Sequence, residues 1–72
     1  MFAVHVLGAG PNYGPYSLYA LEEQARSKAA SYSQSFKERY VVRTVPGDDP
    51  NVPTPPWGHP ILDIYQDGVS SR

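Results

Sequence analysis

The chain has 72 residues, of which 40% are hydrophobic and 18% are charged, and it contains no cysteine. A chain of this length forms one domain with a thin core, and without cysteine it forms neither disulfides nor thiolate metal clusters. A formal net charge of −1 provides no overall basic field, so nucleic acid is not expected as the main partner.

The start of the chain predicts a strand over residues 2–7, because this run is rich in β-branched and apolar residues and stops at Gly8. The same segment lacks the basic start and the long apolar core of a signal peptide. No stretch of the chain approaches the roughly 20 apolar residues that cross a bilayer. We therefore expect a soluble, cytoplasmic protein with no membrane attachment.

Residues 9–16 hold two prolines and two glycines and are predicted to form a loop. The tyrosines and glycines of this loop are typical of a recognition loop, and the alternative is that the tyrosines cover the edges of a thin core. The order Gly8-Ala9-Gly10 after a strand resembles the dinucleotide-binding fingerprint, but the third glycine comes one residue late and Pro15 follows it. Binding of a small anion or a nucleotide by this loop and the helix start is an alternative function. The candidate ligand-loop residues are Gly8, Gly10, Asn12, Tyr13, Gly14 and Tyr16.

An amphipathic helix is predicted to follow Ser17, which is a good N-cap residue. Apolar residues recur at steps of three and four along this segment, which places them on one helical face. Serines near the end of the segment lower its helix propensity, so the last turns are expected to fray. The apolar stripe consists of Leu18, Leu21, Ala25, Ala29, Tyr32 and Phe36.

Two further strands are predicted over residues 40–45 and 61–65. The connector between them, residues 46–60, is rich in proline, which excludes a helix or a central strand and indicates an extended segment anchored by Trp57. Residues 67–72 are polar and are predicted to form a flexible tail. The sequence therefore predicts an α+β fold with one domain over residues 1–66. Its three-stranded sheet follows the order β-α-β-β, with one helix on one face.

Side chains alternate between the two faces of a strand, so the three strands present two sets of residues. One helix covers only one face, and a sizeable apolar patch on the other face usually marks an interaction site. We therefore expect a second protomer or a target protein to cover that second face. The alternative is that the connector folds back and Trp57 covers it within the chain. The set predicted to face the helix is Phe2, Val4, Val6, Tyr40, Val42, Thr44, Leu62 and Ile64, and the predicted interface is Leu7, Val41, Val45, Ile61 and Tyr65.

The same alternation predicts a polar row of His5, Arg43 and Asp63 at the centre of the second face. Arg43 and His5 would hold an anion or a partner carboxylate, with Asp63 orienting one of them. The alternative is an ordinary cross-strand charge pair that sets the strand register.

The sequence gives little indication of a catalytic site or a metal site. There are two histidines and no cysteine, so a closed set of metal ligands is hard to assemble, and no metal site or cofactor is expected. No serine lies on a nucleophile elbow, so the protein is not expected to be an enzyme. A Pro-x-x-Pro spacing begins at Pro50, but no basic residue flanks it, which disfavours recognition by SH3-type domains.

Four segments, residues 2–8, 14–16, 22–25 and 40–43, together resemble short accessory proteins of actinobacterial bacteriophages. In these proteins a strand leads through a Gly-Pro-aromatic turn into a helix and a second strand. The resemblance implies a small binding protein that modulates host or phage machinery, or a minor virion component. It transfers no individual site residue.

The sequence thus predicts a small non-catalytic interaction module that acts through the second face of its sheet. The expected partner is a second copy of the chain or a host or phage protein. A binder of a small anion or nucleotide and a minor virion component held by its proline arm are the alternatives.

Overall fold

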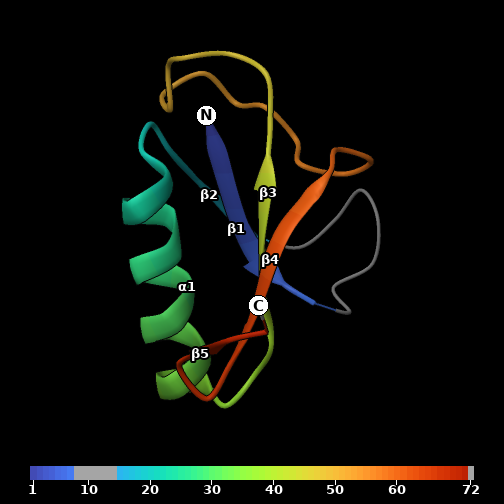
Figure 1. Ribbon diagram of the computed structural model, residues 1–72. Coiled ribbons are helices and arrows are strands. Elements are labelled where there is room, and N and C mark those ends of the chain that lie inside the picture. Colours follow the sequence, from blue (N-terminus) through green and yellow to red (C-terminus); the bar gives the residue numbers. More distant parts are fainter. Residues whose placement is uncertain (8–14, 72) are drawn as a thin grey trace.

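The computed structural model describes residues 1–7 and 15–71 (Figure 1). Its strands form one antiparallel sheet in the order β2-β1-β3-β4-β5, and the single helix of the described residues lies on one side of it (Figure 1). The α+β class and the single helix agree with the prediction, whereas the sheet has five strands instead of three. The elements are β1 (Phe2–Val6), β2 (Tyr16–Tyr19), α1 (Glu22–Phe36), β3 (Tyr40–Thr44), β4 (Ile61–Gln66) and β5 (Val69–Ser70).

The strand β2 occupies residues that were predicted to begin the helix. Ser17 is not an N-cap but lies within β2, opposite Val4, and α1 begins only at Glu22 after an extended Leu21 that makes no side-chain cap hydrogen bond. Tyrosine and serine are poor helix formers, and alternating side chains suit a strand. Pairing with β1 therefore decides the conformation of this segment.

The end of the chain was predicted to be a flexible tail, but residues 67–70 form a hairpin with β4. Asp67 and Gly68 both have positive φ, 54° and 81°, as a two-residue hairpin turn of mirror-image type requires. Val69 then pairs with Gln66. The backbone N–H of Gly68 donates to the Ser33 hydroxyl at 2.9 Å, which ties this turn to α1.

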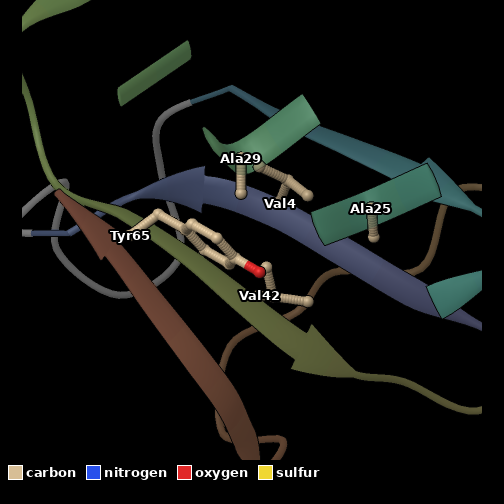
Figure 2. Close-up of a cluster of buried hydrophobic side chains, with 5 residues drawn as sticks. All are labelled: Val4, Ala25, Ala29, Val42 and Tyr65. Atoms are coloured by element: carbon tan, nitrogen blue, oxygen red, sulfur yellow. The ribbon is translucent and has the colours of Figure 1, made fainter. Parts of the chain in front are cut away.

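The core lies between α1 and the sheet and is built from small helical residues and larger strand residues (Figure 2). Ala25 and Ala29 are fully buried, as the predicted stripe requires, and their small size lets α1 approach the sheet closely. The ends of the stripe differ from the prediction, because Leu21 and Phe36 are largely exposed and Ser33 is buried. Figure 2 shows the central cluster, which comprises Val4, Ala25, Ala29, Val42 and Tyr65.

A register shift in the β3–β4 pair changes which β4 side chains face the helix. Val42 lies opposite Asp63, but the next residue, Arg43, lies opposite Ile61, so Leu62 is an extra residue in β4. Leu62 packs against the core and Ile61 is on the second face, both as predicted. For the β4 residues after the register shift, the predicted assignment to the two faces of the sheet is wrong. Asp63 and Tyr65 face α1, and Ile64, which is opposite Val41, belongs to the second face.

Candidate functional site

The second face, meaning the side of the sheet away from α1, consists of three rows of side chains. The strand register places one residue of each neighbouring strand in each row. The Leu7–Arg39 backbone hydrogen bond of 2.8 Å extends the β1–β3 register by one step. The outer row is Leu7, Arg39, Gln66 and Val69, the middle row is Tyr16, His5, Val41 and Ile64, and the inner row is Leu18, Ala3, Arg43 and Ile61.

The connector covers part of the middle and inner rows. The Trp57 ring meets His5 edge-on, with ring centroids 4.7 Å apart, and it also contacts Tyr16 at 6.3 Å. Arg43 Nη1 donates to the carbonyl oxygen of His59 at 2.6 Å. In Figure 1 the last part of the connector and α1 lie on opposite sides of β1 and β3. The connector therefore folds back onto the second face, which was the alternative to a partner.

This cover changes the predicted interface. Val41 and Val45 are 0% and 6% exposed within the single chain, so neither is accessible to a partner in this conformation. Tyr65 was assigned to the interface but is buried against α1, because of the register shift in β4. Leu7 and Ile61 remain exposed on the second face.

Two members of the predicted polar row, His5 and Arg43, do meet. Arg43 Nε donates to His5 Nε2 at 2.9 Å, and His5 Nδ1 lies 2.9 Å from the carbonyl oxygen of Val6. Since the carbonyl only accepts, the ring carries its proton on Nδ1 and is neutral. Burial of the ring lowers the pKa of His5 below 6.5 and the charge of Arg43 lowers it further, against the opposing effect of the Val6 hydrogen bond.

The third member, Asp63, lies on the opposite side of the sheet and is 1% exposed. Arg26 Nη1 donates to its Oδ2 at 2.6 Å, and the Ser70 hydroxyl donates to the same oxygen. Its Oδ1 accepts from the Ser71 hydroxyl at 3.1 Å and from the Ile64 N–H at 2.8 Å. Burial alone would raise the pKa of this carboxyl, but these donors outweigh it and lower the pKa to about 2. Asp63 therefore joins α1, β4 and β5, and it is not part of a binding row.

Among the described residues, the exposed apolar side chains of the second face are Ile61 in the inner row and Leu7 and Val69 in the outer row, which has Ile64 as its neighbour. Val69 is 66% exposed, Leu7 is 36% exposed, and Ile64 is partly buried. A shallow hollow of about 490 Å³ lies here, lined by Ile64, Val69 and Arg39 among others. We call Leu7, Arg39, Ile64, Gln66 and Val69 the open end of the second face.

The candidate ligand loop is largely outside the described residues, which include Tyr16 but not Gly8, Gly10, Asn12, Tyr13 or Gly14. Tyr16 lies in β2 beside Trp57. Because β2 separates the loop from α1, the loop does not run into the helix start. The first turn of α1 carries Glu22 and Glu23, whose negative charges disfavour an anion at that end.

A hollow on the helix side was not predicted. It measures about 180 Å³ and lies between the start of β2 and the end of α1, lined by Ser17, Tyr32, Phe36 and Tyr40 among others. The Tyr32 ring lies 6.0 Å from Phe36 and 5.6 Å from Tyr40, and Phe36 is 63% exposed. The four-residue spacing of Tyr32 and Phe36 on α1 is a signal that these two rings are neighbours, whereas Tyr40 lies on β3 and joins them only through the packing of α1 on the sheet.

Two further observations concern chemistry and membranes. Among residues 1–7 and 15–71, no three His, Asp or Glu side chains are grouped as metal ligands would be. In the same part of the chain, α1 is too short and too polar to span a bilayer.

A scan against models of protein families, a search of curated proteins and a search of solved structures each found no match to this chain. Function is therefore inferred from the geometry of the chain itself.

Proposed function

We propose that the protein is a small non-catalytic interaction module that binds a partner protein through the open end of its second face. The observation that carries this proposal is the uneven cover of that face. Val41 and Val45 are buried within the single chain, whereas Val69 and Leu7 are exposed in the outer row. Val69 and Ile64 line one hollow, and apolar surface gathered in this way usually marks an interaction site.

The chemistry of the open end favours a particular kind of partner segment. The apolar side chains of Ile64 and Val69 line its hollow. The exposed Arg39 provides a fork of donors that suits a carboxylate. A segment with one large apolar side chain next to an acidic residue fits this arrangement. The resemblance to short phage accessory proteins, which implies a binding role in host or phage machinery, supports the same kind of function.

The test compares three single substitutions in binding to partner proteins from a host lysate. Val69→Ser removes apolar surface from the open end, and Leu7→Ser does so at the other side of the row. Val52→Ser is the matched control, because Val52 is 54% exposed but belongs to the connector. We expect V69S and L7S to lose a partner that wild type and V52S retain. Equal retention by all of them contradicts the proposal.

Native mass spectrometry on the same proteins separates a second copy from a different partner. A dimer that V69S dissociates and V52S does not assigns the open end to self-association, with each protomer as the partner protein. If the protein is a monomer at all concentrations, the partner is a different protein. The lysate experiment then decides whether that protein binds at the open end. Detection of the protein in purified phage particles would favour the virion component.

The aromatic hollow on the helix side supports a second candidate function, the binding of a small neutral ring. Tyr32, Phe36 and Tyr40 provide ring faces and edges, and about 180 Å³ accommodates a single aromatic group. Nuclear magnetic resonance with neutral aromatic fragments tests this candidate, with Phe36→Ala as the variant that abolishes binding. Nucleotides and inorganic phosphate in the same screen test the alternative that the protein binds a small anion. This alternative predicts that they bind both wild type and F36A.

A further inference from the structure

The connector is attached to the second face through a chain of contacts centred on His5. The Trp57 ring meets the His5 ring, Arg43 Nε donates to His5 Nε2, and Arg43 Nη1 donates to the His59 carbonyl. Next to Trp57, Pro56 is buried as well. We call His5, Arg43, Trp57 and His59 the latch. It joins two strands of the sheet to the end of the connector.

Only the neutral form of His5 is compatible with these contacts. Nδ1 already donates to the Val6 carbonyl, so an added proton must bind to Nε2, the atom that accepts from Arg43. Two N–H donors would then face each other, and two positive charges would lie within hydrogen-bond distance. His5 is 4% exposed, so little water reaches the new charge while Trp57 remains in place.

Only the Val6 carbonyl, which accepts from Nδ1, favours the charged ring, and the other groups around His5 provide no compensation for that charge. Arg43 approaches from β3 with a positive charge, Tyr16 lies opposite His5 on β2, and the connector contributes the uncharged Trp57 and the His59 carbonyl. Among the described residues, no carboxylate lowers the cost of charging this ring, since Asp63 is on the other side of the sheet. The face of an indole attracts a cation, which acts against release, so the experiment below follows Trp57 itself.

We propose that the connector is an acid-releasable cover of the second face, in which protonation of His5 opens the latch and uncovers the middle row around His5 and Val41. Hydration of the imidazolium requires Trp57 to move, and separation of the two cations removes the hydrogen bond that keeps Arg43 in line with the His59 carbonyl. The opened face would extend the open end from the outer row into the middle row. Only this last consequence rests on the proposed function, because the latch opens or stays closed without any partner.

The chain offers a direct probe, because Trp57 is its single tryptophan. The emission maximum of Trp57 and its quenching by acrylamide are measured between about pH 8 and pH 5. We expect a shift to longer wavelengths and increased quenching at acid pH, half complete below pH 6.5, the ordinary pKa of His5. In the same range the His5 ring titrates in a nuclear magnetic resonance experiment, and the two midpoints should coincide.

Two histidine variants form a matched pair. His5→Gln retains a side-chain acceptor toward Arg43 but takes up no proton in this range, so H5Q should keep Trp57 covered at acid pH. His59→Gln changes the only other histidine, whose carbonyl and not its ring binds Arg43, so H59Q should behave like wild type. An unchanged emission maximum in wild type while His5 becomes charged overturns the proposal. The same shift in H5Q as in wild type also overturns it.

Two controls keep the test valid. If H5Q does not fold, the coincidence of the His5 and Trp57 midpoints in wild type decides alone. Far-ultraviolet circular dichroism across the same range must stay constant, because release of the connector leaves α1 and its contacts to Asp63 in place. Loss of the dichroism signal together with the emission shift means global unfolding and overturns the proposal. The emission shift tests the latch, whereas partner binding tests the proposed function. A V69S variant that loses partner binding but keeps the emission shift shows that the two can be tested independently.

Discussion

Arg26 on α1 and Asp63 on β4 are 37 residues apart in sequence and meet at 2.6 Å inside the fold. Asp63 is completely enclosed, whereas the Arg26 side chain is 31% exposed and also binds Glu22 at 2.9 Å on the surface. Arg26 Nη1 is in addition 3.2 Å from the Tyr65 hydroxyl. The helix α1 and the strands β4 and β5 therefore share one buried carboxylate, and the orientation of α1 on the sheet depends on it.

Asp63→Asn should destabilise the fold strongly. The amide retains the size of the carboxylate but replaces a charged acceptor of several donors with a neutral group, one end of which is itself a donor. We expect a loss of about 3 kcal/mol in the free energy of unfolding, within the range for breaking a buried charge pair. Urea denaturation at neutral pH measures it. Asp67→Asn is the matched control, since Asp67 is exposed and asparagine adopts positive φ well. A loss for D63N no greater than for D67N would show that the network is not stabilising.

The pKa of Asp63 allows a prediction of how the free energy of unfolding changes at acid pH. Its pKa is about 2 in the folded protein and 3.8 in the unfolded chain, so the unfolded chain binds the proton more readily. The stabilisation is complete above about pH 4 and is lost as the pH falls toward 2. A shift of this size corresponds to about 2 kcal/mol. Urea denaturation from pH 5 downward should show this decline in wild type, and D63N should lack it. Parallel pH profiles of the two proteins would contradict the assignment.

The pattern of the chain was sufficient to predict one helix whose inner face includes Ala25 and Ala29, and strands near residues 2–6, 40–44 and 61–66. These elements follow from local periodicity, which survives folding. The inward direction of Asp63 was not predictable in this way. The extra residue Leu62 reverses the alternation along β4, and the partner that makes a buried carboxylate tolerable, Arg26, lies on a distant element.

Two other differences have distinct causes. Leu18 and Leu21 fit a helical stripe, while Tyr16-Ser17-Leu18-Tyr19 also alternates as a strand does, and only pairing with β1 distinguishes the two. In contrast, Asp67-Gly68 is a hairpin signal that can be recognised without any structure. The covered second face was foreseen as an alternative, but composition alone could not decide whether Trp57 or a partner covers it.

Trp57→Ala should uncover the middle row of the second face without removing a residue of the sheet. Trp57 is partly buried, so we expect a loss of about 1–2 kcal/mol, less than for a fully buried large side chain. Exposure of Val41 should also increase binding of a hydrophobic dye at neutral pH. Val52→Ala in the same connector is the control and should change stability by less than about 0.5 kcal/mol. Dye binding by W57A that equals that of V52A would mean that other residues cover Val41.

Ser33→Ala places two opposing effects in competition. Alanine is the better helix former by up to about 0.5 kcal/mol. Against this, Ser33 is fully buried and accepts from the Gly68 N–H, while its own hydroxyl donates to the Ala30 carbonyl at 2.9 Å. A buried N–H left without an acceptor costs about 1–3 kcal/mol, so the net result should be a loss of about 1 kcal/mol in the free energy of unfolding.

Ser31→Ala is the matched control, because Ser31 is exposed on the same helix and its substitution should be neutral or slightly stabilising. Hydrogen exchange should also quicken at the Gly68 amide in S33A but not in S31A. Equal stability and equal exchange in the two variants would show that the hairpin does not depend on its contact with α1.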